Sequence, residues 1–367
     1  RSNRVNYWTG DECKAFEREF ASWTGTNHAV AMANGTLALD AAWPALEIGE
    51  GYEVICTPRT YHASASSIAM AGARPIFADV DIDSQNITPA TVEPLIGPKT
   101  RAIMCVHLAG WPCDMDGFAA LAEKHGLKLI EDCAQAHGAR YRGRSVGSFG
   151  DISGWSFCQD KIITTGGEGG MVTLNDEALW RKIWSYKDHG KSWDAVHRKD
   201  HAPGFRWLHE DWGSNWRLTE MQAAIGRIQL ARMPAWHKAR KANAETLLDA
   251  FKEIAGLRNP ELPDHIEHAW YKFYAFVRPE ALKTGWTRDR IMNTITGHGV
   301  PCYSGSCPEV YREKVFVEAG LAPLQRLPRA VELGETSLMF LVHPTLKADE
   351  LGRAAETVKR VMAEATR

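Results

Sequence analysis

Residues 156–170, with the sequence SFCQDKIITTGGEGG, place a single lysine, Lys161, between two predicted strands. The apolar run Ile152–Phe157 precedes the lysine, and Met171–Leu174 follows a glycine-rich turn. A lysine held between buried strands is costly as an ammonium ion, which favours the neutral amine. A neutral amine can form a covalent bond with a carbonyl cofactor. A lone lysine at a strand end is more often solvated. Features elsewhere in the chain are therefore needed to distinguish a reactive Lys161 from a solvated one.

Length and charge indicate the number of domains and the kinds of partner that are disfavoured. A chain of 367 residues is long for one core, and we expect a large domain over 1–240 and a smaller one over 241–367. The net charge of −2 does not favour a nucleic-acid partner, and no apolar run approaches the roughly 20 residues of a membrane helix. Residues Arg1 to Trp8 lack the apolar core of a signal peptide. We therefore expect a cytoplasmic protein without a membrane partner.

The cysteines and histidines do not form a metal motif. The eight cysteines contain no C-x-x-C pair, which favours reduced and mostly buried thiols. His197 and His201 have H-x-x-x-H spacing, but their segment lacks a helical pattern. We interpret both as solvated loop residues and expect no metal site.

Short apolar strands alternate with helical patterns over the first 170 residues. This order predicts an α/β domain with a mostly parallel sheet covered by helices on both faces. Ligands of such sheets bind at the carboxyl ends of the strands. Several polar residues fall at such ends, and the segment before Lys161 joins them: Thr36, Tyr61, His107 and Asp132.

The turn Asn34-Gly35-Thr36 lies between a predicted strand and a helix that we expect to end or kink at Pro44. Backbone N–H groups at such a turn suit a phosphate, although many α/β turns contain Asn-Gly without binding one.

Asp132 ends a predicted buried strand. Burial there would raise the pKa of its carboxyl group unless a cation compensates. The protonated ring nitrogen of pyridoxal phosphate (PLP) is such a cation. PLP also needs a lysine, phosphate donors and an aromatic face, for which the chain offers Lys161, then Gly35, Thr36 and Ser156, then Tyr61. Each residue alone has a structural explanation, such as a strand-end cap or a core tyrosine. Their joint order along the chain favours a PLP site.

The second half of the chain changes in character. Residues 187–211 are polar without a clear period, yet they contain large aromatic side chains. A helical pattern from Met221 is interrupted at Pro234, and a second one runs to about Ile254. Aromatic and aliphatic strands at Trp270–Val277 and Leu338–Val342, with a closing amphipathic helix, predict a separate α+β unit.

Four segments of the chain resemble the DegT/StrS family of PLP-dependent aminotransferases. They are Asn34–Leu39, Glu131–Ala139, Ser156–Gly170 and Gly213–Leu218, and the resemblance runs from about Gly10 to the C-terminus. It implies a PLP fold-type I domain with a seven-stranded sheet, a smaller C-terminal domain and a homodimer with shared active sites. It also implies amino transfer from L-glutamate to a nucleotide-linked ketosugar in the biosynthesis of amino sugars for lipopolysaccharide, surface glycans or glycosylated metabolites.

The resemblance assigns roles to individual residues. Lys161 would bind the cofactor covalently and then act as acid and base, Asp132 would pair with the pyridinium, and Tyr61 would stack on the ring. The phosphate would be held by Gly35, Thr36 and Ser156, with Asn215 reaching in from the neighbouring subunit. Gln135 replaces a histidine of many relatives near the cofactor's ring oxygen.

The substrate is less well defined. Residues that we consider as sugar, nucleotide or donor contacts are Trp8, Thr9, Gly10, His107, Lys187, Arg217 and Tyr303. Arg217 suits either the donor carboxylate or a cap at the subunit interface. Family frequency favours a 4-keto hexose over a 3-keto sugar.

Three other functions stay open. A PLP-dependent sugar dehydratase is disfavoured because relatives of that type carry histidine in place of Lys161. A PLP-binding sensor without turnover would keep the same motifs. An NAD-dependent sugar enzyme is disfavoured because no G-x-G-x-x-G follows the first strand.

Overall fold

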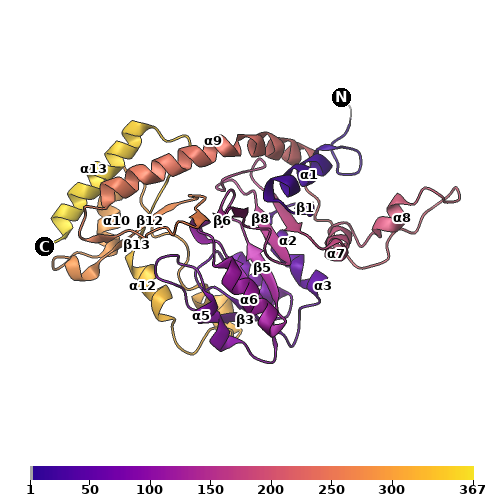
Figure 1. Ribbon diagram of the computed structural model, residues 1–367, viewed down its shortest axis with the longest axis horizontal. Coiled ribbons are helices and arrows are strands. Elements are labelled where there is room, and N and C mark those ends of the chain that lie inside the picture. The colour runs from indigo at the N-terminus through magenta and orange to yellow at the C-terminus, as the bar shows by residue number, and fades with distance from the viewer. Residues whose placement is uncertain (1–2) are drawn as a thin grey trace.

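A seven-stranded sheet forms the centre of the larger part of the protein in the computed structural model (Figure 1). The structure describes residues 3–367, so Arg1 and Ser2 of the N-terminal stretch lie outside the described residues. Within this sheet, β9 runs antiparallel to both of its neighbours, β1 and β8, and the other pairs are parallel, so the predicted mostly parallel sheet is confirmed. Its order is β1 (His28–Met32), β9 (Gly170–Leu174), β8 (Ile152–Ser156), β5 (Lys128–Asp132), β4 (Thr100–Val106), β2 (Glu53–Cys56) and β3 (Arg74–Phe77).

Helices cover both faces of this sheet, as predicted. On one face, Trp155 of β8 packs with Phe16 and Phe20 of α1 (Glu12–Thr24) and with Leu230 of α9 (Glu220–Phe251). On the other, Val172 of β9 packs in a cluster with residues of α3 and α7. The remaining helices of this part are α2 (Gly35–Asp40), α3 (Ala42–Leu46), α4 (His62–Met70), α5 (Pro89–Val92), α6 (Met115–His125) and α7 (Glu177–Lys187).

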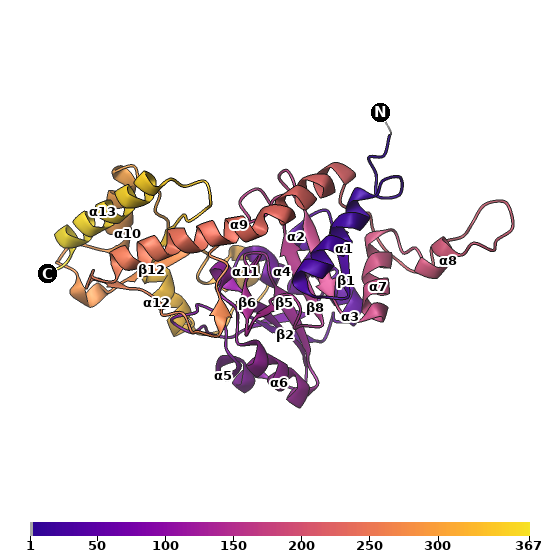
Figure 2. The same ribbon diagram turned by 45° about the horizontal axis from the view of Figure 1, so that its top comes forward.

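The helix α9 connects the two parts of the protein without a break (Figure 2). The predicted interruption at Pro234 is wrong, because this proline lies on the solvent side within the helix. Packing at both ends outweighs the lost hydrogen bond: Leu230 belongs to the sheet-side core and Leu247 to the core of the C-terminal part. Residue 240 lies inside α9, and the division into 1–240 and 241–367 stays a prediction.

The C-terminal part is the expected α+β unit. Its antiparallel strands β10 (Leu257–Arg258), β12 (Phe273–Val277) and β13 (Ser337–Phe340) pack against α9, α10 (Arg288–Gly297) and α13 (Ala348–Ala365). The segment with α11 (Lys314–Glu318) and α12 (Pro328–Thr336) instead packs on the larger part. A third, small sheet joins β11 (Ile266–Glu267) to β6 (Arg140–Tyr141) and β7 (Arg144–Ser145).

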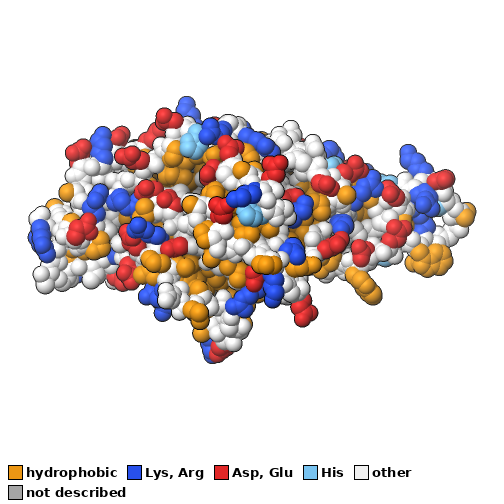
Figure 3. Space-filling view, turned by 60° about the horizontal axis from the view of Figure 1, so that its bottom comes forward, with side chains coloured by type: hydrophobic (Ala, Val, Ile, Leu, Met, Phe, Trp, Pro, Cys, Tyr) orange, Lys and Arg blue, Asp and Glu red, His pale blue; other side chains and the backbone are white. Residues whose placement is uncertain are grey.

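The polar stretch after α7 projects from the body as an arm that begins with α8 (Trp193–His197) (Figures 1 and 2). His197 therefore ends a short helix, whereas His201 follows outside it. Figure 3 shows hydrophobic side chains on this arm. The exposed fractions of Phe205, Trp207 and Trp212 are 80%, 83% and 89%.

All eight cysteines are unpaired, as predicted, and most of them are buried. Within residues 3–367, no helix combines the length and the apolar character that a membrane crossing requires.

Candidate active site

Two adjoining hollows lie at the carboxyl ends of the parallel strands and share four lining residues, Tyr61, Gln135, Asp160 and Lys161. Their volumes are about 600 Å³ and about 410 Å³, which is the size range of small-molecule sites. The larger hollow reaches Asp132 and the turn before α2, and the smaller one reaches residues of the C-terminal part. The predicted convergence at the strand ends is therefore present for Thr36, Tyr61, Asp132, Ser156 and Lys161.

Lys161 lies in the loop between β8 and β9. Main-chain hydrogen bonds from Phe157 to Gly169 and from Thr165 to Phe157 fold this loop back on itself. Gly166 and Gly167 have φ values of +86° and +126°, which other residues rarely adopt. The glycines thus form the tight return that brings the strand of the lysine against β9.

A short polar network surrounds the amine of Lys161. The Nζ atom lies 3.7 Å from Oδ1 of Asp160, and the hydroxyl of Tyr271 donates to Oδ2 of the same carboxylate over 2.6 Å. Burial would raise the pKa of Asp160, but the Tyr271 hydroxyl and the charges of Lys161 and Lys272 outweigh it and hold the pKa below its usual value. Asp160 is therefore an anion at neutral pH.

Asp132 is a buried carboxylate, 5% exposed, with two fixed hydrogen bonds. Ser64 donates to Oδ2 over 2.7 Å, and the main-chain N–H of Ala134 donates to Oδ1 over 3.0 Å. No ion pair joins Asp132 to a lysine, arginine or histidine among residues 3–367. A buried carboxylate without a cationic partner fits a ligand that supplies a positive charge at this position.

The turn before α2 approaches the end of β8 very closely. A Cβ atom at Gly35 would lie 2.5 Å from Cβ of Ser156, so a larger residue would fill this space. The side chain of Asn34 caps α2 by accepting from the N–H of Leu37 over 3.0 Å. Thr36 and Ser156 line the same hollow, and the first N–H groups of a helix have no partner within it. This cradle suits a small anion such as a phosphate.

Two further residues frame the space between the cradle and Lys161. The side-chain oxygen of Gln135 accepts from the N–H of Ala109 over 2.7 Å, which leaves its amide N–H groups to serve as donors. Tyr61 precedes α4 and is 70% exposed, so its ring borders both hollows with an open face.

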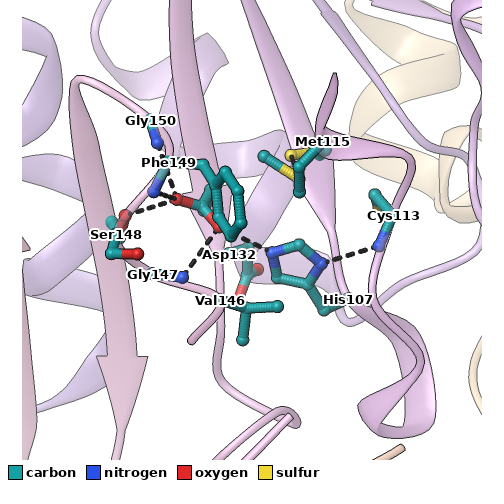
Figure 4. A network of polar contacts seen from close by, with 12 residues as sticks. His107, Cys113, Met115, Asp132, Val146, Gly147, Ser148, Phe149 and Gly150 are labelled. Carbon is teal, nitrogen blue, oxygen red and sulfur yellow. Dashed lines mark hydrogen bonds and ion pairs between the residues drawn. The ribbon is translucent and has the colours of Figure 1, made fainter. Parts of the chain in front are cut away.

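The prediction that His107 contacts a substrate is wrong. Its ring is fully buried, Nδ1 accepts from the N–H of Cys113 and Nε2 contacts Glu131, each over 3.0 Å (Figure 4). Because side chains alternate along a strand, Glu131 lies on the opposite face from Asp132, and His107 joins it there. Further donors to the Glu131 carboxylate are Gly147, Phe149, Gly150 and Ser153.

The prediction that Lys187 contacts a substrate is also wrong. It is fully buried, with Nζ 3.9 Å from the centre of the Tyr7 ring and 3.6 Å from Oε1 of Glu17. Lys187 is the last residue of α7, and the helix directs its side chain into the core. The polar sequence that follows Lys187 did not indicate this burial. Of the predicted substrate contacts, Tyr303 lines the smaller hollow, whereas Trp8, Thr9, Gly10 and Arg217 line neither one.

The sequence reasoning missed four lining or supporting residues: Ser64, Asp160, Tyr271 and Lys272. Ser64 follows Tyr61 by one helical turn, so its position could have been found from helical spacing. Tyr271 and Lys272 directly precede the aromatic strand β12, and only the packing of the C-terminal part reveals that they border the site.

Comparisons with known proteins agree with this geometry. The model of the DegT/DnrJ/EryC1/StrS aminotransferase family matches residues 2–359. An X-ray structure of the aminotransferase from Psychrobacter cryohalolentis is 60% identical, covers 99% of this chain and 94% of its own, and superposes with a TM-score of 0.97.

Two curated relatives have more specific names. The UDP-N-acetyl-3-dehydro-alpha-D-glucosamine 3-aminotransferase of Acidithiobacillus ferrooxidans is 36% identical over 98% of this chain and 90% of its own. The dTDP-3-amino-3,4,6-trideoxy-alpha-D-glucose transaminase of Streptomyces venezuelae is 34% identical over 96% of this chain and 88% of its own. The chain belongs to the DegT/DnrJ/EryC1/StrS family and is a PLP-dependent aminotransferase.

Proposed function

We propose that the protein transfers an amino group from L-glutamate to a nucleotide-linked ketosugar in amino-sugar biosynthesis. The observation that carries the proposal is the larger hollow, which is lined by Lys161, by Asp132 without a cationic partner and by the cradle at Gly35. The names of the relatives from A. ferrooxidans and S. venezuelae, which specify nucleotide sugars, support the substrate class.

The residues of the cavity fit the cofactor. When bound, PLP supplies an aldehyde and a protonated ring that spreads negative charge from the reacting carbon. Asp132 would hold the ring nitrogen, because its carboxylate is fixed by Ser64 and Ala134 and lacks a cation. Gly35, Thr36 and Ser156 would hold the phosphate. Tyr61 would stack on the ring, and the amide N–H of Gln135 would donate to the ring oxygen.

Lys161 would link the enzyme to the cofactor and afterwards move the proton between the reacting carbons through its Nζ atom. Asp160 is the anion nearest to this amine, at 3.7 Å, and the hydroxyl of Tyr271 holds its carboxylate in place. These two residues would therefore orient Lys161 during proton transfer.

The ring position of the keto group is the finer part of the proposal. Family frequency favours a 4-keto hexose. A 3-keto sugar is the second candidate, because the name of one relative specifies a 3-dehydro sugar, the name of the other a 3-amino sugar, and both align with nearly all of this chain.

We further propose a homodimer with shared active sites. Asn215 is exposed in the single chain, which suits a residue that would reach a neighbour's phosphate. The exposed aromatic side chains of the arm, Phe205, Trp207 and Trp212, are costly in water and suit burial against a second copy. A cytoplasmic location remains an expectation.

Two half-reactions test the proposal directly. Purified holoenzyme mixed with L-glutamate should convert its cofactor to the amine form, and nucleotide-linked 3-keto and 4-keto hexoses should convert it back with formation of an amino sugar. Chromatography and mass spectrometry of the products identify the sugar. A PLP sensor would complete neither half-reaction, a dehydratase would release a deoxygenated sugar, and either result would contradict the proposal.

A further inference from the structure

The wall of the smaller hollow that faces the C-terminal part carries an unpaired ammonium group. Lys272 lines this hollow and is half-buried, and its Nζ atom lies 4.7 Å from the centre of the Tyr271 ring. Within residues 3–367, its side chain makes no ion pair and no hydrogen bond. Burial lowers the pKa of Lys272, and the charges of Arg240 and Lys161 lower it further against the opposing effect of Asp160.

The only carboxylate among the residues that line this smaller hollow is already engaged. Both oxygens of Asp160 are taken, one by the hydroxyl of Tyr271 at 2.6 Å and the other by the amine of Lys161 at 3.7 Å. Arg240, buried behind the wall, donates to the main-chain oxygens of Trp270 and Tyr271 and adds positive charge. Positive charge therefore exceeds negative charge around this end of the cavity, which favours an anionic ligand group.

The position of Lys272 favours the carboxylate of the amino donor over the diphosphate of the nucleotide sugar as its ligand. The amines of Lys161 and Lys272 lie near the same ring, 5.2 Å and 4.7 Å from the centre of Tyr271. A group held by Lys272 therefore lies in the same hollow as the nitrogen of Lys161, where the amino group of the donor has to react. In an amino acid the α-carboxylate is bonded to the reacting carbon, whereas the diphosphate of a nucleotide sugar is separated from its keto carbon by part of the sugar ring.

We infer that Lys272 binds a carboxylate of the amino donor and so contributes to donor specificity. This inference rests on the proposed function, because it assigns the donor of that reaction to a part of its cavity. Tyr303 and Ser306 line the same hollow and provide further hydroxyl groups. An ammonium in a half-buried wall, with no protein anion of its own, gives a charge-assisted hydrogen bond to a carboxylate that enters the cavity.

The test compares four holoenzymes: the wild type, Lys272→Met, Lys272→Arg and Lys359→Met. The methionine variant keeps the length of the side chain without its charge, and the arginine variant keeps the charge. Lys359 lies on α13 and lines neither hollow, so its variant controls for loss of a lysine elsewhere. Each protein is mixed with L-glutamate alone, and the conversion of the cofactor is followed by absorbance. Calorimetry then measures binding of glutarate, which has two carboxylates but no amine, and of UDP.

We expect Lys272→Met to raise the half-saturating glutamate concentration by about tenfold or more, the loss expected for a hydrogen bond to a charged group. Glutarate binding should weaken by a similar factor and UDP binding should not change. Lys272→Arg should recover most of the affinity, and Lys359→Met should match the wild type. An unchanged response to glutamate and glutarate in Lys272→Met would overturn the inference, as would a loss confined to UDP. A wild-type protein that glutamate does not convert would instead refute the proposed donor, and glutarate binding would still decide the role of Lys272.

Discussion

Ser64 donates its hydroxyl proton to Oδ2 of Asp132 over 2.7 Å. Because an ionised carboxylate only accepts, the hydroxyl of Thr60, 2.8 Å from Ser64, is the donor in the next hydrogen bond of the chain. The N–H of Ala134 holds the other carboxylate oxygen. The carboxylate plane is thus fixed before any ligand binds, which is how a site avoids reorganisation on binding.

Removal of this hydrogen bond should weaken the cofactor site without unfolding the protein. In Ser64→Ala, we expect PLP affinity to fall by about tenfold, because a hydrogen bond to a charged group contributes roughly 1.5–3 kcal/mol. Asp132→Asn should lose more, since it removes the charge itself. Equilibrium dialysis of apoprotein with PLP measures both. Ser66→Ala lies in the same helix outside the cavity and should bind PLP like the wild type. Equal affinity of Ser64→Ala and Ser66→Ala would refute the proposed role.

The cradle makes a steric prediction. In Gly35→Ala the new methyl group would lie 2.5 Å from Cβ of Ser156, so the turn or the strand end has to move. We expect PLP binding to weaken by at least about tenfold, and inorganic phosphate should lose its ability to compete with PLP. A Cβ at Gly97 meets no atom within 4 Å, so Gly97→Ala is the matched control. If both variants bound PLP equally, the phosphate site would have to lie elsewhere.

The buried pair of His107 and Glu131 should make the stability of the protein depend on pH. Burial would raise the pKa of Glu131, but the hydrogen bond and charge of His107 and the N–H groups of Gly150 and Gly147 hold it below its usual value. A carboxyl with a depressed pKa stabilises the fold above its unfolded pKa of about 4.3, and this stabilisation is lost as the pH falls through the folded pKa.

Glu131→Gln should therefore lower the free energy of unfolding at pH 7 by about 3 kcal/mol, because it disrupts a buried pair. Its stability should also change less than that of the wild type between pH 7 and pH 4. Urea unfolding at several pH values measures both effects. Glu356→Gln, at an exposed pair on α13, should follow the wild type. A wild-type pH dependence in Glu131→Gln would show that this carboxyl does not carry the effect.

The arm predicts the oligomeric state. Replacement of Phe205, Trp207 and Trp212 by serine should shift the protein from the proposed dimer to a monomer, because it removes about 25 cal/mol for each Å² of apolar surface that would be buried between subunits. Light scattering after size-exclusion chromatography measures the mass. Leu324 is exposed outside the arm, and Leu324→Ser should stay dimeric. A triple variant that kept the dimer mass would place the interface elsewhere.

The sequence was sufficient for the sheet and for the residues that end its strands. Buried strands such as β4 and β9 are largely apolar runs, and the polar ends of β5 and β8 gave Asp132 and the neighbourhood of Lys161. Local patterns could not show which side of a strand end faces the cavity. His107 and Asp132 both follow apolar runs, yet only Asp132 borders the space that contains Lys161.

Two errors have a tertiary origin. Pro234 is tolerated within α9 because both flanks of the helix are packed in separate cores, which no local signal at the proline reveals. Lys272 belongs to a buried aromatic strand by its pattern, and it reaches the cavity only because β12 packs beside the loop of Lys161.

Lys161 would bind the cofactor covalently, and reduction of the holoenzyme with borohydride tests this role. Without reduction, the Lys161→Ala variant should catalyse transamination about 10²–10⁴-fold more slowly than the wild type, or slower still, since it lacks the acid–base group. After reduction, digestion and mass spectrometry, we expect one pyridoxyl phosphate group, on the peptide that contains Lys161, and none in Lys161→Ala. A reduced protein without the group, or with the group on another lysine, would show that Lys161 does not bind the cofactor.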